Sequence, residues 1–575
     1  MDIRFSRKIY LSGFIILGLA LLYYQVLRGE YFMTRARDNY VRVLSIPYIR
    51  GAILDRNGEA LAEDRAAFNI AVIPYQIEGK MDTLFEKLAI PAGLSEAKLY
   101  RNYKRNFEGV FSPVDIIVDV DKETALKIKE QFNDSVLINP QPRRYYSYPY
   151  ECSHILGYVK EAGSLPGSED LQKYGYSLSE RVGAAGLEKY YDMYLKGEDG
   201  GDLIEVDSRG KTVGFLGERQ AQNGKSIQLT IDARIQKAAY DSLAGKTGAV
   251  LMMNSQTGEI LAAVSSPSYD PNDFMRGKNA GAYLLSDTKP MLNRFVQSVY
   301  PIGSTFKPVM AVAALEEEKI TPYTSFDCTG RFSFGRTSFK CWNTHGIQDL
   351  EKALAHSCNF YFYTLGKMLG GQIMSRWAGK FGFNKLSGID LPYERKGVVP
   401  EVNGSSFTLG DSIVRSWFGG DNINFAIGQG YMQITPMELL VGINAIADGG
   451  YLVRPHFLKK VDNVESEVSS RSYLGISRVN LDVVKKGMAQ VVHAADGTAR
   501  ILKPLDLKVA GKTGTAQNPG IPHGWFVGFF PYDNPRYSFL VFTEHSGASY
   551  ESVKVAVKFL SVLKEQNIFG DKNDR

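Results

Sequence analysis

The first strong pattern along the chain is an apolar run near its start. Residues 9 to 27 carry no charged side chain. At about 1.5 Å per helical residue, such a run crosses a hydrocarbon core of roughly 30 Å. A buried helix and a cleaved signal peptide are the alternatives, but the bulky residues from Leu21 to Val26 offer no small-residue cleavage site. The pattern therefore predicts an uncleaved membrane-spanning helix over residues 9–28, preceded by a short tail over residues 1–8.

From about residue 40 to residue 220, short strand-like and helix-like runs alternate, and no convincing nucleophile stands out. Phe68–Ile73 is typical of a strand, and Asp55–Gly58 is typical of a turn. We expect Asp55 and Arg56 to form a buried structural ion pair beside that turn. We expect Glu188, which precedes Lys-Tyr-Tyr, to lie on a helix surface or in an inter-domain contact.

A second region begins near Gly224. Asp232 is a plausible N-cap for a helix that carries Ile235, Ala238, Ala239 and Leu243 on one face. The strands predicted in this region are 248–254, 258–265, 508–515, 525–530 and 537–544, and a helix is predicted over 553–564. Strands at both ends with helices between them predict an α+β domain with a five-stranded, largely antiparallel sheet and helices on its faces.

Length and composition narrow the class of protein. A chain of 575 residues is too long for one compact domain, so two or three are expected. Hydrophobic residues make up 44% and charged residues 22%, as in ordinary globular protein. The net charge of +5 is small and dispersed, so it gives no case for nucleic-acid binding.

Three short motifs follow one another in the second region: Ser304-x-x-Lys307, Ser357-Cys358-Asn359 and Lys512-Thr513-Gly514-Thr515. A lysine one helical turn beyond a serine can take the proton of its hydroxyl, provided that burial or nearby cations depress the pKa of the lysine. Other copies of the first and third motifs are read as a solvated helix face (Ser561 to Lys564) and a turn (Lys246 to Gly248). The ordered set is far less probable by chance than any single motif.

The ordered trio resembles that of class A β-lactamases and penicillin-binding proteins, except that Cys358 fills the middle of the second motif, where acidic or small residues are common. With its flanks, nearly the whole chain resembles a class B penicillin-binding protein, a membrane-anchored peptidoglycan transpeptidase. The segment 284–294 is more similar to the elongation type, penicillin-binding protein 2, than to the division type. The flanks that carry the resemblance are Arg50–Gly58, Gly183–Glu188, Leu229–Asp232, Gly428-Gln429-Gly430 with Thr435-Pro436, and Trp525–Gly528.

The resemblance implies a domain organisation and a location. Residues 40–220 would form an elongated, non-catalytic pedestal of the penicillin-binding protein dimerisation type. Residues 224–567 would form the transpeptidase domain, with the serine β-lactamase and penicillin-binding fold. Positive charges lie on both sides of the predicted span: Arg4, Arg7 and Lys8 before it, and Arg28, Arg35 and Arg37 after it. The difference in positive charge between the two sides therefore gives a poor indication of the orientation of the span. The resemblance implies a single-pass protein of the inner membrane with its catalytic domain in the periplasm.

The resemblance also implies a role for each motif residue in forming a serine acyl-enzyme that cross-links stem peptides during elongation. Ser304 would attack the carbonyl between two D-alanines, and Lys307 would accept its proton. Ser357 and Lys512 would pass a proton to the leaving amine. Asn359 would bind the peptide. Thr513, Gly514 and Thr515 would form the substrate-binding strand, with the two hydroxyls on the terminal carboxylate, and the backbone N–H groups of Ser304 and Thr515 would face the oxyanion. β-Lactams would acylate the same serine.

The cysteines leave two alternatives open. Cys328, Cys341 and Cys358 fall close together, with His345 between the last two. An extracytoplasmic compartment favours a Cys328 to Cys341 disulfide, whereas four soft ligands also suit tetrahedral Zn²⁺. Elongation-type relatives can carry zinc in this part of the fold, which would make it structural; catalysis needs no cofactor. Cys152 stands apart and is expected to be a buried apolar residue.

Other functions remain as alternatives. They are a division-type transpeptidase, a D,D-carboxypeptidase that uses water as the acceptor, and a β-lactam-sensing binding protein. A sensor would require several membrane spans, and one is evident. From the resemblance we expect the partners to be a polytopic glycan polymerase of the SEDS family and rod-shape scaffold proteins, with stem peptides and β-lactams as ligands and no nucleic acid.

Overall fold

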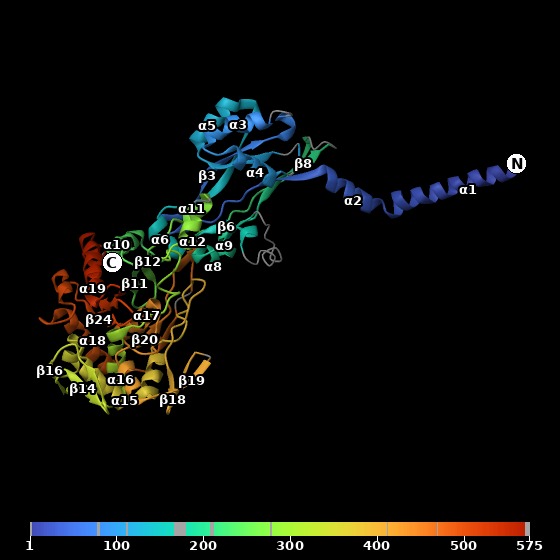
Figure 1. Ribbon diagram of the computed structural model, residues 1–575. Helices are drawn as coiled ribbons and strands as arrows, with labels where there is room; N and C mark the ends of the chain where they lie inside the picture. The colour runs from blue at the N-terminus through green and yellow to red at the C-terminus, as the bar shows by residue number, and fades with distance from the viewer. Residues whose placement is uncertain are drawn as a thin grey trace. The chain divides into compact units, whose positions relative to one another are not determined.

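The computed structural model describes residues 3–77, 81–107, 109–110, 113–165, 180–207, 212–276, 279–410, 412–467 and 470–569. The chain forms two compact units, each built from segments far apart in the sequence (Figure 1). The first unit combines Met1–Gly51, Asp64–Arg144 and Lys196–Gly224; the second combines Ala52–Glu63, Tyr145–Leu195 and Lys225–Arg575. The boundaries at 40–220 and 224–567 remain predictions.

The N-terminal apolar run is helical, as predicted. Helix α1 (Ile3–Leu22) continues into a π-helical turn, η1 (Tyr23–Leu27), and α2 (Gly29–Tyr40) follows. Within the described part of the chain, one helix, over Arg7–Leu27, is long and apolar enough to cross a membrane. Its large apolar side chains, such as Phe14 and Ile16, are exposed in the isolated chain.

The first unit contains two small sheets. Strands β1 (Val41–Ile46), β8 (Gly200–Val206) and β9 (Thr212–Arg219) pair antiparallel in that order. The second half of β3 (Ala60–Val72) pairs with β4 (Val114–Val120), and β5 (Leu137–Tyr146) also pairs with β3. A separate apolar core joins them to helices α3 (Met81–Ala92), α4 (Glu96–Asn106) and α5 (Lys122–Phe132).

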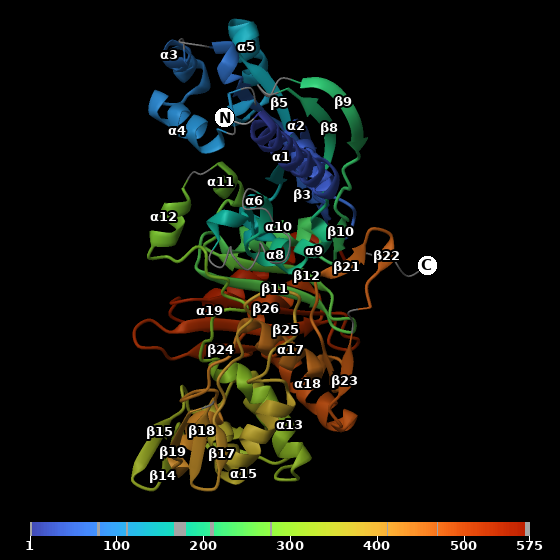
Figure 2. The ribbon, with the colours of Figure 1, turned by 90° about the vertical axis from the view of Figure 1, so that its right-hand side faces the viewer.

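The second unit is organised around the predicted five-stranded sheet. The strands lie side by side in the order β12-β11-β26-β25-β24, and every neighbouring pair is antiparallel (Figure 2). The strand bounds are β11 Gly248–Asn254, β12 Ile260–Ser266, β24 Ala510–Ala516, β25 His523–Phe530 and β26 Tyr537–Thr543. The fold prediction is therefore confirmed, and the strand ends differ from the predicted ones by only a few residues.

Alternating side chains of the sheet enter two different cores. Val250 and Met252 of β11 join a core with helices α10 (Ala233–Leu243) and α19 (Ser549–Glu565). Ala249, Leu251 and Met253 point to the opposite face and join the large core that includes α13 (Lys307–Glu316) and α17 (Pro436–Ala447). The sheet is thus buried on both faces, and the predicted N-cap is confirmed because the Asp232 carboxylate accepts from the Arg234 N–H.

Further elements of the second unit surround this sandwich. Strands β22, β21, β10, β2 and the start of β3 pair side by side in that order. The bounds are β2 Ile53–Leu54, β6 Val159–Glu161, β7 Arg181–Gly183, β10 Ile227–Leu229, β13 Phe326–Cys328, β14 Arg331–Phe334, β15 Thr337–Lys340, β16 Gly346–Gln348, β17 Glu401–Asn403, β18 Ser406–Leu409, β19 Ser412–Ser416, β20 Tyr451–Val453, β21 Leu458–Val461, β22 Val464–Glu465, β23 Arg471–Tyr473, α6 Pro149–Leu156, α8 Gly186–Tyr190, α9 Asp192–Leu195, α11 Pro271–Arg276, α12 Ala280–Leu285, α14 Leu350–Ala355, α15 Asn359–Lys380, α16 Gly419–Phe425 and α18 Arg478–His493.

One local prediction is wrong, and one of the two alternatives for a second residue is excluded. Asp55 is fully buried but accepts hydrogen bonds from the backbone N–H groups of Asn57 and Glu59 instead of pairing with Arg56, whose guanidinium lies 3.5 Å from Glu259. Glu188 is fully buried and accepts from the Tyr146 hydroxyl, so it is not on a helix surface. In both cases a buried carboxylate is satisfied by hydrogen bonds that no sequence pattern marks. Cys152 is 1% exposed, which confirms that prediction.

Candidate active site

The nucleophile candidate lies in a tight turn that leads into a buried helix. Ser304 occupies the 3₁₀ turn η5 (Gly303–Phe306), and α13 begins at Lys307 with Pro308 in its first turn, where a missing N–H costs nothing. Every residue of α13 from Lys307 to Leu315 is buried. The Ser304 side chain remains partly exposed, so the hydroxyl is accessible while the neighbouring amine is not.

The Lys307 amine has three oxygen partners. Its Nζ lies 2.8 Å from the Ser357 carbonyl oxygen, 3.2 Å from Ser357 Oγ and 2.6 Å from Asn359 Oδ1. Burial lowers the pKa of Lys307 to about 7, because the charged ammonium loses its hydration. A buried amine that is half neutral near pH 7 can accept a proton from a hydroxyl.

The Lys-Thr-Gly-Thr motif lies on β24, the edge strand of the five-stranded sheet. Lys512 is fully buried, and its Nζ donates to the Thr513 carbonyl oxygen at 3.2 Å. Burial first, and the charge of Lys307 second, lower the pKa of Lys512 well below its usual value. Burial thus weakens the preference of Lys512 for its charged form, which a nearby carboxylate would strengthen.

The hydroxyls of the strand differ in exposure. Thr515 is exposed, and its Oγ1 accepts from the Ser549 N–H at 3.1 Å. Thr513 is buried, and its Oγ1 lies 2.9 Å from Thr498 Oγ1. Thr498 was not predicted, because only the short Gly-Thr pair after the α18 helix marks it in the sequence.

Two glycines allow the nucleophile turn and β24 to approach closely. A Cβ at Gly303, where φ is +57°, would lie 2.7 Å from the Thr515 carbonyl oxygen. A Cβ at Gly514 would lie 2.8 Å from the Ile302 carbonyl oxygen. Both distances are shorter than real Cβ contacts, so the structure brings the first and third motifs together through backbone that only glycine permits.

The second motif forms a strained turn. Ser357 has φ +52°, a left-handed conformation that costs a non-glycine residue free energy. The turn brings Ser357 and Asn359 to Lys307, as described above. The predicted residues Ser304, Lys307, Ser357, Asn359, Lys512, Thr513, Gly514 and Thr515 thus come from α13, α15, β24 and their adjoining turns in one unit.

The cysteine cluster supports this turn directly. Each of Cys328, Cys341, His345 and Cys358 offers one ligand atom, a sulfur or a ring nitrogen. These four atoms lie within 4.8 Å of one another. All four cysteines of the chain, including Cys152, are free thiols in the structure. The Cys341 sulfur accepts from the Asn359 N–H at 3.2 Å, so the cluster contacts the catalytic motif.

The donor set fits a tetrahedral soft-metal site. The Cys358 thiol donates toward Cys341, which lowers the pKa of Cys341 and raises that of Cys358. His345 Nδ1 lies 3.5 Å from both Cys328 Sγ and Cys341 Sγ. Three sulfurs and one imidazole at this spacing are the ligands that Zn²⁺ prefers in structural sites.

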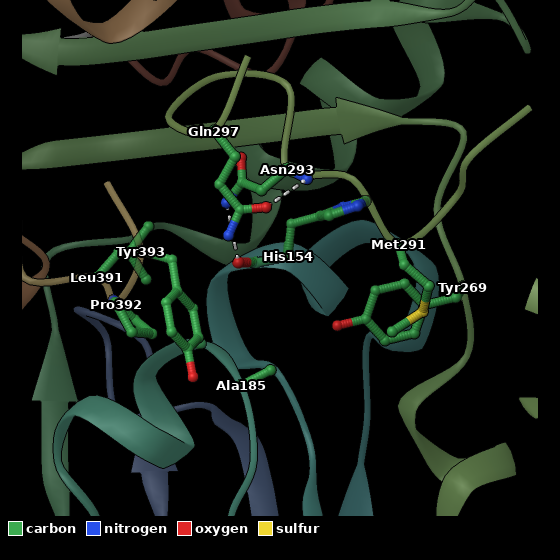
Figure 3. Close-up of a pocket in the computed structure, with 10 residues that line it drawn as sticks. His154, Ala185, Tyr269, Met291, Asn293, Gln297, Leu391, Pro392 and Tyr393 are labelled. Atoms are coloured by element: carbon green, nitrogen blue, oxygen red, sulfur yellow. Dashed lines mark hydrogen bonds between the residues drawn. The ribbon is translucent and has the colours of Figure 1, made fainter. Parts of the chain in front are cut away.

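A separate pocket of about 50 Å³ lies elsewhere in the same unit (Figure 3). Its lining residues are His154, Ala185, Gly186, Tyr269, Met291, Asn293, Gln297, Leu391, Pro392 and Tyr393. His154 is buried there, which lowers its pKa to about 3, and its carbonyl oxygen accepts from Asn293 Nδ2 at 3.3 Å. The predicted site residues, all of which the structure describes, do not line this pocket.

Comparison with known proteins identifies the family. Residues 248–564 match the penicillin binding protein transpeptidase domain, and residues 45–229 match the penicillin-binding protein dimerisation domain. The chain therefore belongs to the penicillin-binding protein transpeptidases. The acyl transfer of this family needs no catalytic cofactor.

Individual relatives define the type. The chain is 30% identical to the peptidoglycan D,D-transpeptidase MrdA of Haemophilus influenzae over 98% of this chain and 91% of the relative. It is also 30% identical to MrdA of Escherichia coli K12, over 95% of this chain and 91% of that one. Within the family, the chain is a D,D-transpeptidase of the elongation type, penicillin-binding protein 2.

Solved structures agree. Penicillin-binding protein 2 from Helicobacter pylori, in its complex with MreC, matches with a TM-score of 0.80 and 28% identity over 92% of this chain and 100% of that one. A chain from a peptidoglycan synthase complex that coordinates polymerization and crosslinking matches with a TM-score of 0.72 and 27% identity, covering 100% of this chain and 99% of that one. The similarity thus extends over both units.

Proposed function

We propose that Ser304 and Lys307 perform the acylation step of stem-peptide cross-linking. Lys307 Nζ takes the Ser304 hydroxyl proton while Oγ attacks the carbonyl carbon between the two D-alanines. The observation that carries this assignment is the buried Lys307 amine, whose lowered pKa suits a base near pH 7. The backbone N–H groups of Ser304 and Thr515 stabilise the oxyanion that forms.

The second half of the acylation releases the terminal D-alanine. The C–N bond breaks, the leaving amine takes a proton through Ser357 and Lys512, and an ester remains on Ser304. Asn359 binds the peptide, and Thr513, Gly514 and Thr515 form the strand along which it lies, with the two threonine hydroxyls on the terminal carboxylate. The open edge of β24 supports this, since an edge strand offers unpaired backbone groups.

The ester is then attacked by the amine of a second stem peptide. The new amide is the cross-link, and the proton from the amine returns to Ser304 as it leaves. β-Lactams acylate the same hydroxyl and remain attached because their acyl-enzyme blocks the acceptor.

The cluster of Cys328, Cys341, His345 and Cys358 holds a structural Zn²⁺ in this proposal. The metal supplies a rigid crosslink between β13, the loop before β16 and the Ser357–Asn359 turn, and it takes no part in bond breaking. The contact from the Asn359 N–H to the Cys341 sulfur supports this role.

The helix over Arg7–Leu27 anchors the protein in the inner membrane, and the chain that follows it, including the catalytic domain, lies in the periplasm. Its partners are a rod-shape scaffold protein and a SEDS-family glycan polymerase, bound through the anchor and pedestal. The Helicobacter pylori complex with MreC and the synthase complex support these classes of partner. A substitution in the pedestal that abolishes polymerase activation but leaves penicillin acylation intact would support binding of the polymerase through the pedestal. Unchanged activation after substitutions across the whole pedestal surface would contradict it.

Fluorescent penicillin tests the enzyme assignment. The full-length chain in detergent is expected to form a stable adduct, whose modified peptide contains Ser304 by mass spectrometry. Ser304→Ala should form none at any concentration. An adduct that survives Ser304→Ala, or a wild-type chain that forms none, would overturn the assignment.

A further inference from the structure

Trp342 has an exposed ring, but its indole N–H is hydrogen-bonded within the protein. Its side chain lies in the loop between β15 and His345 and is 60% exposed. Its Nε1 nevertheless donates to two successive backbone carbonyl oxygens, that of His356 at 3.0 Å and that of Ser357 at 3.3 Å. An exposed tryptophan is more often satisfied by water, so this direction of the ring calls for an explanation.

The second of those carbonyls belongs to the catalytic site. The Ser357 carbonyl oxygen also accepts from Lys307 Nζ at 2.8 Å, which uses both of its lone pairs. Ser357 is left-handed, and the turn is held by backbone bonds from its N–H to the Leu354 oxygen at 3.2 Å and from the Cys358 N–H to the Ala353 oxygen at 2.9 Å, whereas the Ser357 carbonyl oxygen itself is held by Lys307 and Trp342. The indole N–H thus holds this carbonyl from outside the turn.

The direction of this carbonyl determines the direction of the Lys307 lone pair. A neutral amine has two N–H bonds and one lone pair, and two acceptors face it that cannot donate, the Ser357 carbonyl oxygen and Asn359 Oδ1. Once both N–H bonds point to these oxygens, the lone pair is left for a hydroxyl, and the Ser357 hydroxyl oxygen lies 3.2 Å from the amine. Loss of either acceptor would let the amine rotate away from the orientation that accepts a proton.

We propose that Trp342 is a positioning residue for acylation, whose indole N–H fixes the Ser357 carbonyl and thereby the orientation of the Lys307 amine. The inference rests on the proposed role of Lys307 as base. It is separate from the metal cluster, although the Trp342 ring packs edge to face on His345 with centroids 4.9 Å apart.

The chain contains a matched control. It has four tryptophans, and the Nε1 of Trp377 donates to a side chain, Glu317 Oε1, at 2.8 Å. Replacement of Trp342 or Trp377 by 3-benzothienylalanine exchanges the N–H for sulfur and keeps the shape of the ring. Trp342→Phe is a second, genetically simple variant at an exposed position, where folding is little affected.

The experiment measures acylation of the full-length chain by fluorescent penicillin, with the saturating rate constant separated from the dissociation constant. Both Trp342 variants should lower the rate constant about tenfold with unchanged dissociation constant, melting temperature and zinc content by native mass. The Trp377 isostere should match wild type. An unchanged rate constant in the Trp342 isostere, or a loss that follows zinc content, would overturn the proposal. Failure of the proposed function would differ, because Ser304→Ala would then retain its adduct.

Discussion

The two sides of the candidate active site are held in place by different physical means. On one side, Lys512 to Thr515 belong to β24, whose register is fixed by seven successive pairings with β25, from Ala510 with Phe529 to Ala516 with His523. On the other side, Ser357 is a single left-handed residue between two helices, α14 and α15. No strand pairing fixes its conformation; the backbone hydrogen bonds that end α14 do, from the Ser357 N–H to the Leu354 oxygen and from the Cys358 N–H to the Ala353 oxygen, and Lys307 and Trp342 contact its carbonyl.

The difference shows which parts of the site depend on the global fold. A one-residue slip of β24 would move Lys512 to the other face of the sheet, so the buried pattern of the whole strand protects it. The Ser357 turn can change without unfolding the sheet. We therefore expect substitutions on the strand side to affect stability and acylation together, and substitutions on the turn side to affect acylation more.

The largest effect is expected where both sides meet, at Lys307. Lys307→Met keeps most of the buried stem and removes the base, so acylation by penicillin should fall by about 10²- to 10⁴-fold. Stopped-flow measurement of the acylation rate checks this. Lys367→Met, at an exposed position of α15, is the matched control and should leave the rate unchanged. A Lys307→Met enzyme with wild-type acylation would exclude Lys307 as the base.

Gly514→Ala tests the strand side. Its Cβ would lie 2.8 Å from the Ile302 carbonyl oxygen, so the nucleophile turn must shift, and acylation should fall by about 100-fold with a lower melting temperature. Gly379→Ala in α15 meets no atom within 4 Å and should raise helix stability by roughly 0.5–1 kcal/mol. Equal behaviour of the two variants by calorimetry and acylation would refute the close approach.

His345→Ala tests the turn side. Loss of one of four ligands should abolish retention of a zinc ion, seen as a lower native mass, and should slow acylation roughly 10- to 100-fold. Removal of zinc from the wild-type protein by a chelator should also slow acylation. Added Zn²⁺ should restore the chelated wild-type protein but not His345→Ala. A native mass lower by two hydrogens and without metal would instead establish the Cys328–Cys341 disulfide.

The smallest effect is the pH dependence of wild-type acylation. Because burial lowers the pKa of Lys307 to about 7, the neutral base is present above that pH and is lost below it. The acylation rate should therefore rise about tenfold between pH 6 and pH 8, with a midpoint near 7. A flat profile over this range, with the protein folded throughout by circular dichroism, would contradict the assigned base.

Regular periodicity explains what could be predicted from the sequence. The strands of the five-stranded sheet and the N-cap at Asp232 follow from alternation and capping chemistry, which are local. The motif residues were selected because their order is a strong signal, and their catalytic roles remain predictions. The left-handed Ser357, the bond from Asn359 to the Cys341 sulfur, Thr498 and the Trp342 N–H were not, since each depends on segments that only the folded chain brings together.

The arrangement of the tryptophans also has an optical consequence. The indole of Trp342 is exposed to solvent and contacts the Ser357 turn. Trp525 is fully buried, and its N–H donates to the carbonyl oxygen of Pro301, which precedes Ser304 by three residues. Occupancy of the candidate active site should thus alter the red edge of the emission spectrum first, through Trp342. The difference spectrum between wild type and Trp342→Phe isolates that contribution, so unlabelled substrates can be followed by intrinsic fluorescence.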